Sequence, residues 1–186
     1  MDARREDGST PAVAWTVKSR PRYAPPRLDE GGGRHLALAG PDGARALQDW
    51  LRRDGDRAAI ESHDLSAAAA APEWLRARLA TVHMDLRLYL FGREDWLWRM
   101  ARAARDAGLS RDAMHLHATG LGTRRVWCVH CRTVLEEVRA TPVACPGCAR
   151  HLQVRDHFSR ELAAYLGVQA DAETPGELPE PRSLDA

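Results

Sequence analysis

The sequence contains no long apolar run. Its longest alanine stretch, Ala67–Ala71, falls far short of the ~20 residues that a helix needs to cross a bilayer. The first seven residues, Met1 to Asp7, are mostly charged, and no apolar core follows them, so we expect no secretory signal. These absences predict a cytoplasmic protein with no membrane association.

Lysine is almost absent, because Lys18 is the only lysine among 27 basic residues. In a chain so rich in alanine, this bias is typical of GC-rich coding. The 26 acidic residues bring the net charge to +1, which gives no overall attraction to nucleic acid or to acidic membranes. The length of 186 residues and the hydrophobic fraction of 44% fit one domain with a small second module.

Cysteine is absent outside residues 128–148, where four cysteines cluster. In a cytoplasmic chain, such clustering favours metal binding or redox chemistry over disulfides.

The first 33 residues predict a flexible N-terminal arm, because Pro, Gly, Arg and Asp dominate them. Pro21, Pro25 and Pro26 exclude a helix there. Within the arm, Trp15-Thr16-Val17 and Arg22-Tyr23 can dock as extended strips, either on the body of the chain or on a partner. We favour the body.

Residues 34–119 predict a Rossmann-like α/β domain, a small parallel sheet flanked by helices. Expected strands alternate with expected helices along this stretch; the strands are His35–Ala39, Ala58–Ser62, Leu86–Phe91 and Met114–His117, and the helices start near Ala44, Pro72 and Glu94. In such a fold a ligand binds beyond the carboxyl ends of the strands, here near Gly40–Gly43 and Gly92–Glu94.

Residues 124–168 predict a zinc-ribbon or rubredoxin-like module, joined to the first domain by a hinge over 119–123. We expect a hairpin over residues 133–143, a third strand at Leu152–Val154 and a short C-terminal helix from Ser159 to Leu166. The module has seven basic and four acidic residues. The remaining residues, 169–186, have five acidic residues and one arginine and predict a disordered acidic tail.

The strongest chemical signal is a pair of Cys-x-x-Cys motifs. Cys128 and Cys131 form the first, Cys145 and Cys148 form the second, and thirteen residues separate them. Each tight turn can aim two sulfurs at one ion, so the four thiolates predict a closed, structural zinc site. Iron in a rubredoxin-like, redox-active site has the same ligands and geometry and stays open as an alternative, as do two disulfides.

The histidines give weaker signals. His130 lies inside the first motif and can in principle replace a cysteine. His115 and His117 share one face of a strand, which fits either part of a metal site or a half-polar strand face. In Arg155-Asp156-His157 we read Asp156 as a helix-side acid and His157 as a packing residue, because no nucleophile is near. We therefore expect no catalytic residues.

Two stretches resemble known families. Leu88–Gly92, a helix ending at Asp106–Leu109 and Met114–His117 resemble the last βαβ unit of ferredoxin-reductase nucleotide domains. More specifically, residues 15 to 168, roughly, resemble the dimethylamine monooxygenase subunit (DmmA-like) family. The C-terminal half carries most of this resemblance, which rests on Arg125–Cys131, Cys145–Cys148, Leu152–Ser159 and Tyr165–Val168.

The DmmA-like resemblance implies a subunit of a multi-component, NAD(P)H-dependent monooxygenase that N-demethylates secondary amines. It implies partner subunits, namely a flavin and iron–sulfur reductase and an iron or haem oxygenase. Gly40-Pro41-Asp42-Gly43 keeps only fragments of a reductase Gly-rich turn, and about 33 residues leave no room for the flavin barrel, which needs on the order of a hundred residues. Flavin and nucleotide binding are therefore not carried over, although Arg93 can contact a phosphate if it is not simply a surface residue.

We therefore expect a non-catalytic, oxidoreductase-associated subunit built from two modules. Trp96 and Trp98 lie two apart at a helix start, so one can be core while the other faces a partner. The competing hypothesis is a zinc ribbon that binds nucleic acid or protein with no redox role. Arg124-Arg125 favours nucleic acid, whereas the acidic tail and the lack of interleaved exposed aromatics argue against it.

Overall fold

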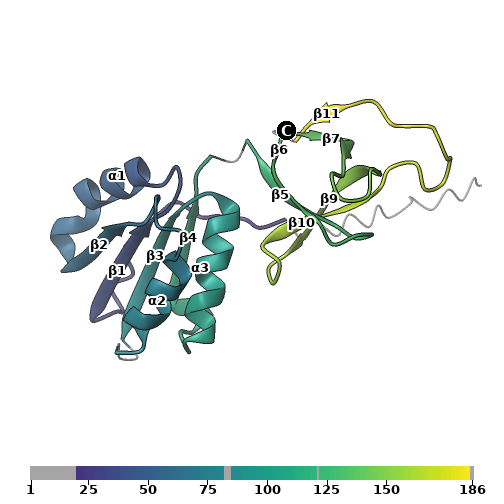
Figure 1. The fold of residues 1–186 in the computed structure, drawn as a ribbon. Helices are drawn as coiled ribbons and strands as arrows, with labels where there is room; N and C mark the ends of the chain where they lie inside the picture. The colour runs from purple at the N-terminus through teal and green to yellow at the C-terminus, as the bar shows by residue number, and fades with distance from the viewer. Residues whose placement is uncertain (1–19, 82–84, 121, 185–186) are drawn as a thin grey trace, which may run out of the picture.

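The fold is described from a computed structural model, which covers residues 20–81, 85–120 and 122–184. The first layer is a four-stranded parallel sheet in the order β2-β1-β3-β4 (Figure 1). Its strands are β1 (Arg34–Ala39), β2 (Ile60–Asp64), β3 (Leu86–Gly92) and β4 (Met114–Ala118). Its helices are α1 (Ala44–Asp54), α2 (Ala71–Leu79) and α3 (Glu94–Asp106), with short 3-10 turns at Gly55–Arg57 and Arg111–Ala113. The predicted α/β class, a parallel sheet flanked by helices, is confirmed.

Alternate side chains of β3 point to opposite faces of this sheet. Tyr89 and Phe91 pack on Trp50 of α1, with ring centroids 4.6 and 5.5 Å apart. Leu88 and Leu90 point to the opposite face, into a core that α2 and α3 cover. One helix thus covers the first face and two cover the second, so the first face is left without a helix over β4.

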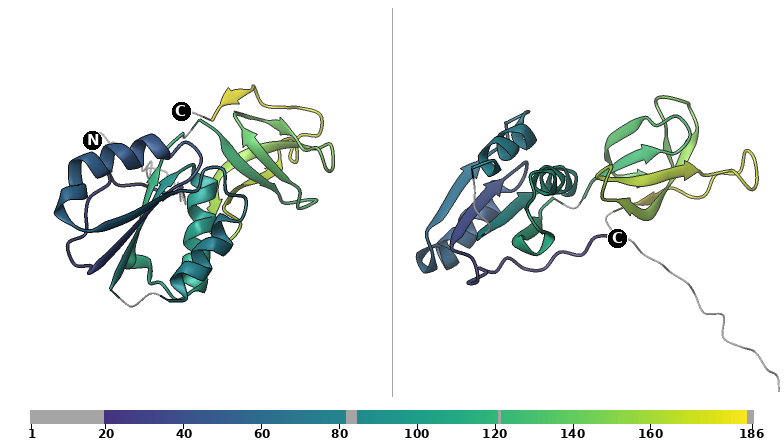
Figure 2. Two further views of the ribbon diagram at one scale, coloured as in Figure 1. Left: turned by 60° about the vertical axis from the view of Figure 1, so that its left-hand side comes forward. Right: turned by 90° about the horizontal axis from the view of Figure 1, so that it is seen from below.

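The N-terminal arm, residues 20–33, occupies that place. The carbonyl of Ala24 accepts a hydrogen bond from Nδ1 of His117, which lies on the face of β4 that no helix covers. The Asp29 amide donates to the Tyr89 hydroxyl at 2.9 Å, and the Asp29 carboxylate lies 2.6 Å from Nε of Arg87. Figure 2 shows the arm, in purple, running between the second module and β1.

Tyr23 fastens the start of the arm to α3. Its hydroxyl donates to Oε1 of Glu94 at 2.7 Å and accepts from Nε1 of Trp98 at 2.9 Å. Of the two strips expected in the arm, this one therefore docks on the body of the chain, whereas Trp15-Thr16-Val17 lies outside the described residues.

A second sheet of five strands follows, in the order β6-β5-β10-β9-β8. Its strands are β5 (Arg124–Cys128), β6 (Val134–Val138), β8 (Val143–Ala144), β9 (His151–Ser159) and β10 (Ala164–Gln169). A separate core lies on it, built around Val126, Leu152 and Tyr165. Small as it is, the module thus has an apolar centre of its own.

Two sequence predictions for this module are wrong. The hairpin expected over residues 133–143 does not form, because β6 pairs with β5 and β8 pairs with β9. The short C-terminal helix is instead a turn followed by β10, the central strand of the sheet. Leu162, Ala163 and Leu166 have helical spacing, but Leu162 is 36% exposed and Tyr165 is buried. The pairing of β10 with β5 along one edge and with β9 along the other overrides this local helical pattern.

The tail also differs from its prediction at its described end. Residues 172–181 are exposed, but β11 (Arg182–Ser183) pairs with the short strand β7 (Ala140–Thr141), and Leu184 is buried in the second core. The pairing of β11 with β7 and the burial of Leu184 thus tie the end of the polar tail to the second module.

Trp98 joins the two modules. It packs partly against both cores, its ring lies 5.7 Å from Phe158, and the Arg160 guanidinium lies 5.2 Å from its centroid. Trp96 is buried in the first core, as expected for one of the pair. The side of Trp98 that we expected to face another protein is thus used within the chain.

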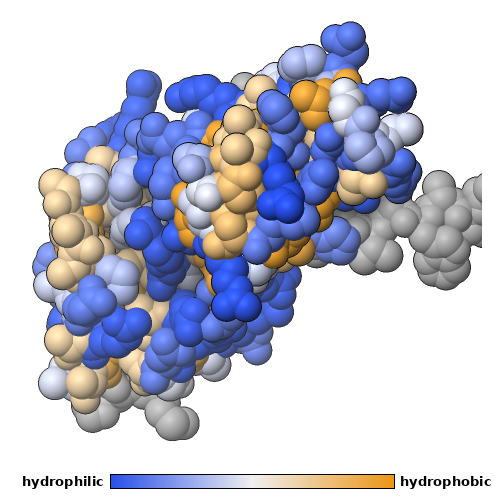
Figure 3. Space-filling view, turned by 45° about the vertical axis from the view of Figure 1, so that its right-hand side comes forward, coloured by the Kyte–Doolittle hydropathy of each residue, from blue (hydrophilic) through white to orange (hydrophobic). Residues whose placement is uncertain are grey.

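The surface shown in Figure 3 is mainly hydrophilic, with apolar side chains in small groups. Among the described residues, the large hydrophobic side chains that are exposed are Val129, Leu162 and Leu178. None of the described helices combines the length and the apolar character that crossing a membrane requires.

Candidate metal centre

The four cysteines lie at the tips of two hairpins. Cys128 and Cys131 form the turn between β5 and β6, and Cys145 and Cys148 form the turn between β8 and β9. Strand β10 lies between the two hairpins in the sheet and pairs with β5 and β9. An ion bound between the tips would therefore link the two outer pairs of strands around the central one.

The two turns repeat the same backbone hydrogen bonds. The Cys128 amide donates to the Thr133 carbonyl at 2.9 Å, and the Cys145 amide donates to the Arg150 carbonyl at 2.8 Å. In each turn the amide one residue past the second cysteine donates back to the first, from Arg132 to Cys128 and from Ala149 to Cys145, both at 2.9 Å. The two Cys-x-x-Cys motifs, which have the same spacing in the sequence, thus form turns with the same backbone hydrogen bonds.

Arg132 and Ala149 both have left-handed backbone, with φ of 66° and 59°. Glycine is the residue that tolerates this conformation, and neither position has it. The sequence therefore carried no signal for these two positions.

Gly147 allows the two turns to approach each other. A Cβ atom there would overlap the Thr133 hydroxyl and lie 3.1 Å from Sγ of Cys131. The hydroxyl also lies 3.2 Å from that sulfur. Thr133 and Gly147 thus belong to the site although sequence reasoning missed them; the glycine inside Cys-Pro-Gly-Cys was the available signal.

The sulfur atoms have the separations of a tetrahedral site. All four lie within 4.8 Å of one another, with Cys128 to Cys148 at 3.8 Å and Cys131 to Cys145 at 3.5 Å. Four thiolates at about 2.3 Å from one ion lie about 3.8 Å apart, so the residues present fit such an ion. A disulfide needs about 2.05 Å, and the cysteines are free thiols, so the disulfide alternative is wrong for this structure.

Hydrogen bonds and burial act on these thiols in opposite directions. Hydrogen bonds from Thr133 lower the pKa of Cys131 to about 6, and the Arg150 amide lowers the pKa of Cys148. Burial raises the pKa of Cys145 to about 11. A bound cation offsets the burial of this thiolate, because its charge favours the ionised form.

The structure separates the histidines from this cluster. Among the described residues, only the four cysteines form a group of three or more potential metal ligands within bonding reach. His130 is exposed on the first turn. His115 and His117 lie on the first sheet, where burial lowers the pKa of both imidazoles, that of His117 to about 4.

The remaining candidate residues have structural contacts. Asp156 and His157 lie within β9 rather than beside a helix, and Asp156 accepts a hydrogen bond from Arg124 at 3.1 Å. Arg93 forms an ion pair at 2.7 Å with Glu137 of the second module.

The turn beyond β1, where a ligand site is expected, packs directly against protein. A Cβ on Gly40 would overlap the indole of Trp96, and one on Gly43 would overlap the Phe91 carbonyl. These glycines therefore allow the turn to pack directly on α3 and β3.

Comparisons with known proteins find a family match over the cysteine-bearing module. Residues 125–168 match the model of the family described as dimethylamine monooxygenase subunit DmmA-like, C-terminal domain. The chain is also 43% identical over 101 residues to the haem-dependent oxidative N-demethylase delta subunit of Ectopseudomonas mendocina (strain ymp). That match covers 54% of this chain and 58% of the relative, so the chain spans less than two thirds of the relative's length. No solved structure matches the chain.

Proposed function

We propose that the chain, whose residues 125–168 match the DmmA-like C-terminal domain family, is an accessory subunit of a multi-component oxidative N-demethylase. In this role it carries a structural four-thiolate zinc site and performs no catalytic step itself. Its partners are the haem-bearing oxygenase and the flavin and iron–sulfur reductase of an NAD(P)H-dependent complex acting on a secondary amine such as dimethylamine.

The observation that carries this proposal is the convergence of four sulfurs inside the matched segment. Cys128 and Cys145 are buried, and four thiolates complete a tetrahedron, so no position is left for a substrate. Such an ion supplies folding free energy by linking the two hairpin tips. The module has roughly 45 residues, a size at which a fold usually needs such a link.

Metal analysis of the purified full-length chain tests the site. We expect one zinc ion per chain and a colourless protein, whereas iron would give a red protein that bleaches with dithionite and would make the subunit an electron carrier. Cys145→Ser should abolish stoichiometric metal and unfold the second sheet, while His130→Ala should leave both unchanged because His130 is exposed. Full folding of Cys145→Ser without metal contradicts the structural role.

Co-expression with the other subunits tests the assembly. We expect the chain to co-purify with the oxygenase and reductase, and amine-dependent NAD(P)H oxidation to fail when it is left out. Unchanged oxidation without the chain would exclude the accessory role while leaving the metal result standing.

A further inference from the structure

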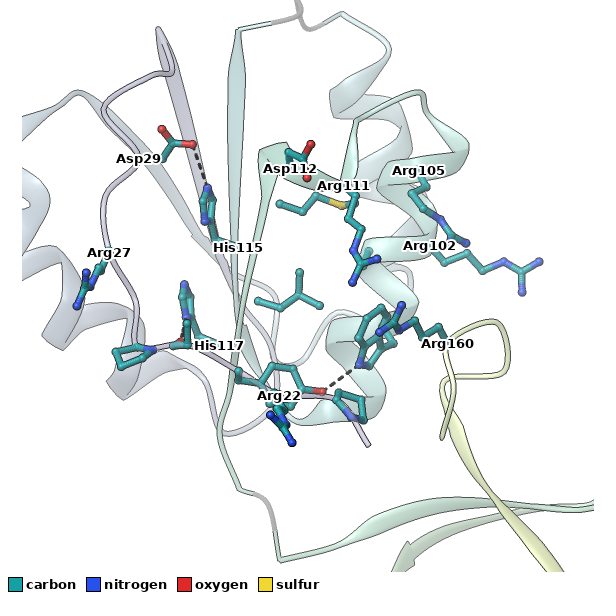
Figure 4. Close-up of a pocket in the computed structure, with 18 of the residues that line it drawn as sticks. Arg22, Arg27, Asp29, Arg102, Arg105, Arg111, Asp112, His115, His117 and Arg160 are labelled. Atoms are coloured by element: carbon teal, nitrogen blue, oxygen red, sulfur yellow. Dashed lines mark hydrogen bonds and ion pairs between the residues drawn. The ribbon is translucent and has the colours of Figure 1, made fainter. Parts of the chain in front are cut away.

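A groove of about 570 Å³ lies along β4, away from the metal centre. The N-terminal arm forms one wall, α3 and the turn at Arg111–Ala113 form the other, and Arg160 reaches in from the turn between β9 and β10 (Figure 4). Its volume is within the range of ligand-binding clefts, about 300–1,000 Å³.

The open edge of a strand faces this groove. β4 is the outermost strand of the first sheet, and within the described part of the chain no strand pairs with its outer edge. Four consecutive residues, Met114 to His117, line the groove although their side chains alternate between the two faces of the sheet. The groove therefore includes the edge between those faces, where backbone N–H and C=O groups lie.

The groove is strongly basic. Six arginines and two aspartates line it, which gives a formal charge of +4 in a chain whose net charge is +1. Arg102 is paired with Glu161 at 2.6 Å. Arg22, Arg27 and Arg111 are exposed and have no carboxylate partner among the residues that the structure describes.

The groove also has an apolar wall and an unused acceptor. Trp98, Met114 and Leu116 are partly buried apolar residues that line it. Nδ1 of His117 faces the Ala24 carbonyl, so Nδ1 carries the proton and Nε2 of the neutral ring is an acceptor. That Nε2 is buried and has no hydrogen-bond partner in the described chain. An acceptor suits the N–H groups of a peptide, whereas an ionised phosphate offers only acceptors.

We propose that this groove is the docking site of an extended acidic segment of a partner protein, which adds to the sheet as a strand beside β4. Main-chain hydrogen bonds to β4 supply the register, and alternate side chains of the segment face opposite walls. Apolar side chains meet Trp98, Met114 and Leu116, while carboxylates face the arm and meet Arg22 and Arg27. That the partner is another subunit of the demethylase rests on the proposed function, whereas docking itself does not.

A labelled peptide of four Glu-Val repeats, titrated into the isolated full-length chain by fluorescence anisotropy, tests the docking. We expect binding that weakens steeply as salt rises, no binding of the matched Lys-Val peptide, and protection of β4 amides in hydrogen exchange. One of two peptides N-methylated at either all valines or all glutamates should bind at least tenfold more weakly, because alternate amides face one edge.

Charge reversal supplies the control on the protein. Arg22→Glu combined with Arg27→Glu should weaken binding of the acidic peptide at least tenfold, whereas Arg45→Glu, at an exposed arginine on α1, should leave it unchanged. Failure of the acidic peptide to bind overturns the proposal. So does equal binding of both N-methylated peptides, which would exclude main-chain pairing with β4, or displacement by inorganic pyrophosphate at constant ionic strength, which would define a site for small anions. Because no other subunit is present, failure here is distinct from failure to co-purify.

Discussion

Trp98 holds the arm and both modules together, so its replacement should lower stability across the whole chain. Its Nε1 donates to the Tyr23 hydroxyl, which in turn donates to Glu94, and its ring packs on Phe158. A half-buried tryptophan removes roughly 100 Å² of apolar surface from water, worth about 2.5 kcal/mol. The hydrogen bond to Tyr23 adds about 1 kcal/mol.

Two variants separate these contributions. Trp98→Ala should lower the free energy of unfolding by about 3.5 kcal/mol, and Trp98→Phe, which keeps most of the ring contact but has no donor, by about 1–2 kcal/mol. Urea denaturation of the metal-loaded chain, followed by circular dichroism, measures both. Trp74→Ala serves as a matched control, because Trp74 lies on α2 and contacts the first core alone.

Hydrogen exchange then shows where stability is lost. Exchange in Trp98→Ala should accelerate in α3 and in the second sheet together, whereas in Trp74→Ala it should accelerate in the first module only. A loss below about 1 kcal/mol for Trp98→Ala would refute the reasoning, because that is no more than the hydrogen bond alone.

Three further changes test other parts of the structure. Burial lowers the pKa of His117 to about 4, so as the pH falls the unfolded chain takes up this proton before the folded chain does. The stability that the neutral imidazole contributes is fully present above about pH 6.5 and should fall as the pH drops toward 4. Urea unfolding at several pH values should therefore show a weaker dependence of the unfolding free energy on pH for His117→Gln than for the unaltered chain. Gly147→Ala should force the cysteine turns apart at Thr133, weakening metal retention against a chelator and costing about 1–3 kcal/mol, and unchanged retention would contradict the close approach. Ala149→Gly should relieve left-handed backbone and raise the free energy of unfolding by about 0.5–1 kcal/mol, so a loss of stability would show that φ is not strained there.

Local patterns in the sequence determined much of the first module and the identity of the cysteine cluster. Apolar runs such as Leu86–Phe91 and the helical spacing around Trp50 are consequences of burial on one face, so they can be read one segment at a time. The Cys-x-x-Cys spacing is equally local, because it reflects the reach of a single turn. The DmmA-like resemblance rests partly on the same two cysteine motifs.

Tertiary structure decided what depends on which segments meet. Ser159–Leu166 has the spacing of a helix, yet it contributes to β9 and β10, because β10 completes hydrogen bonds with β5 and β9, distant in sequence. The groove along β4 likewise takes its arginines from the arm, α3, the turn before β4 and the second module. No stretch of sequence shows these residues as neighbours. Periodicity records which face of a segment is buried, whereas strand order and long-range packing decide what covers that face.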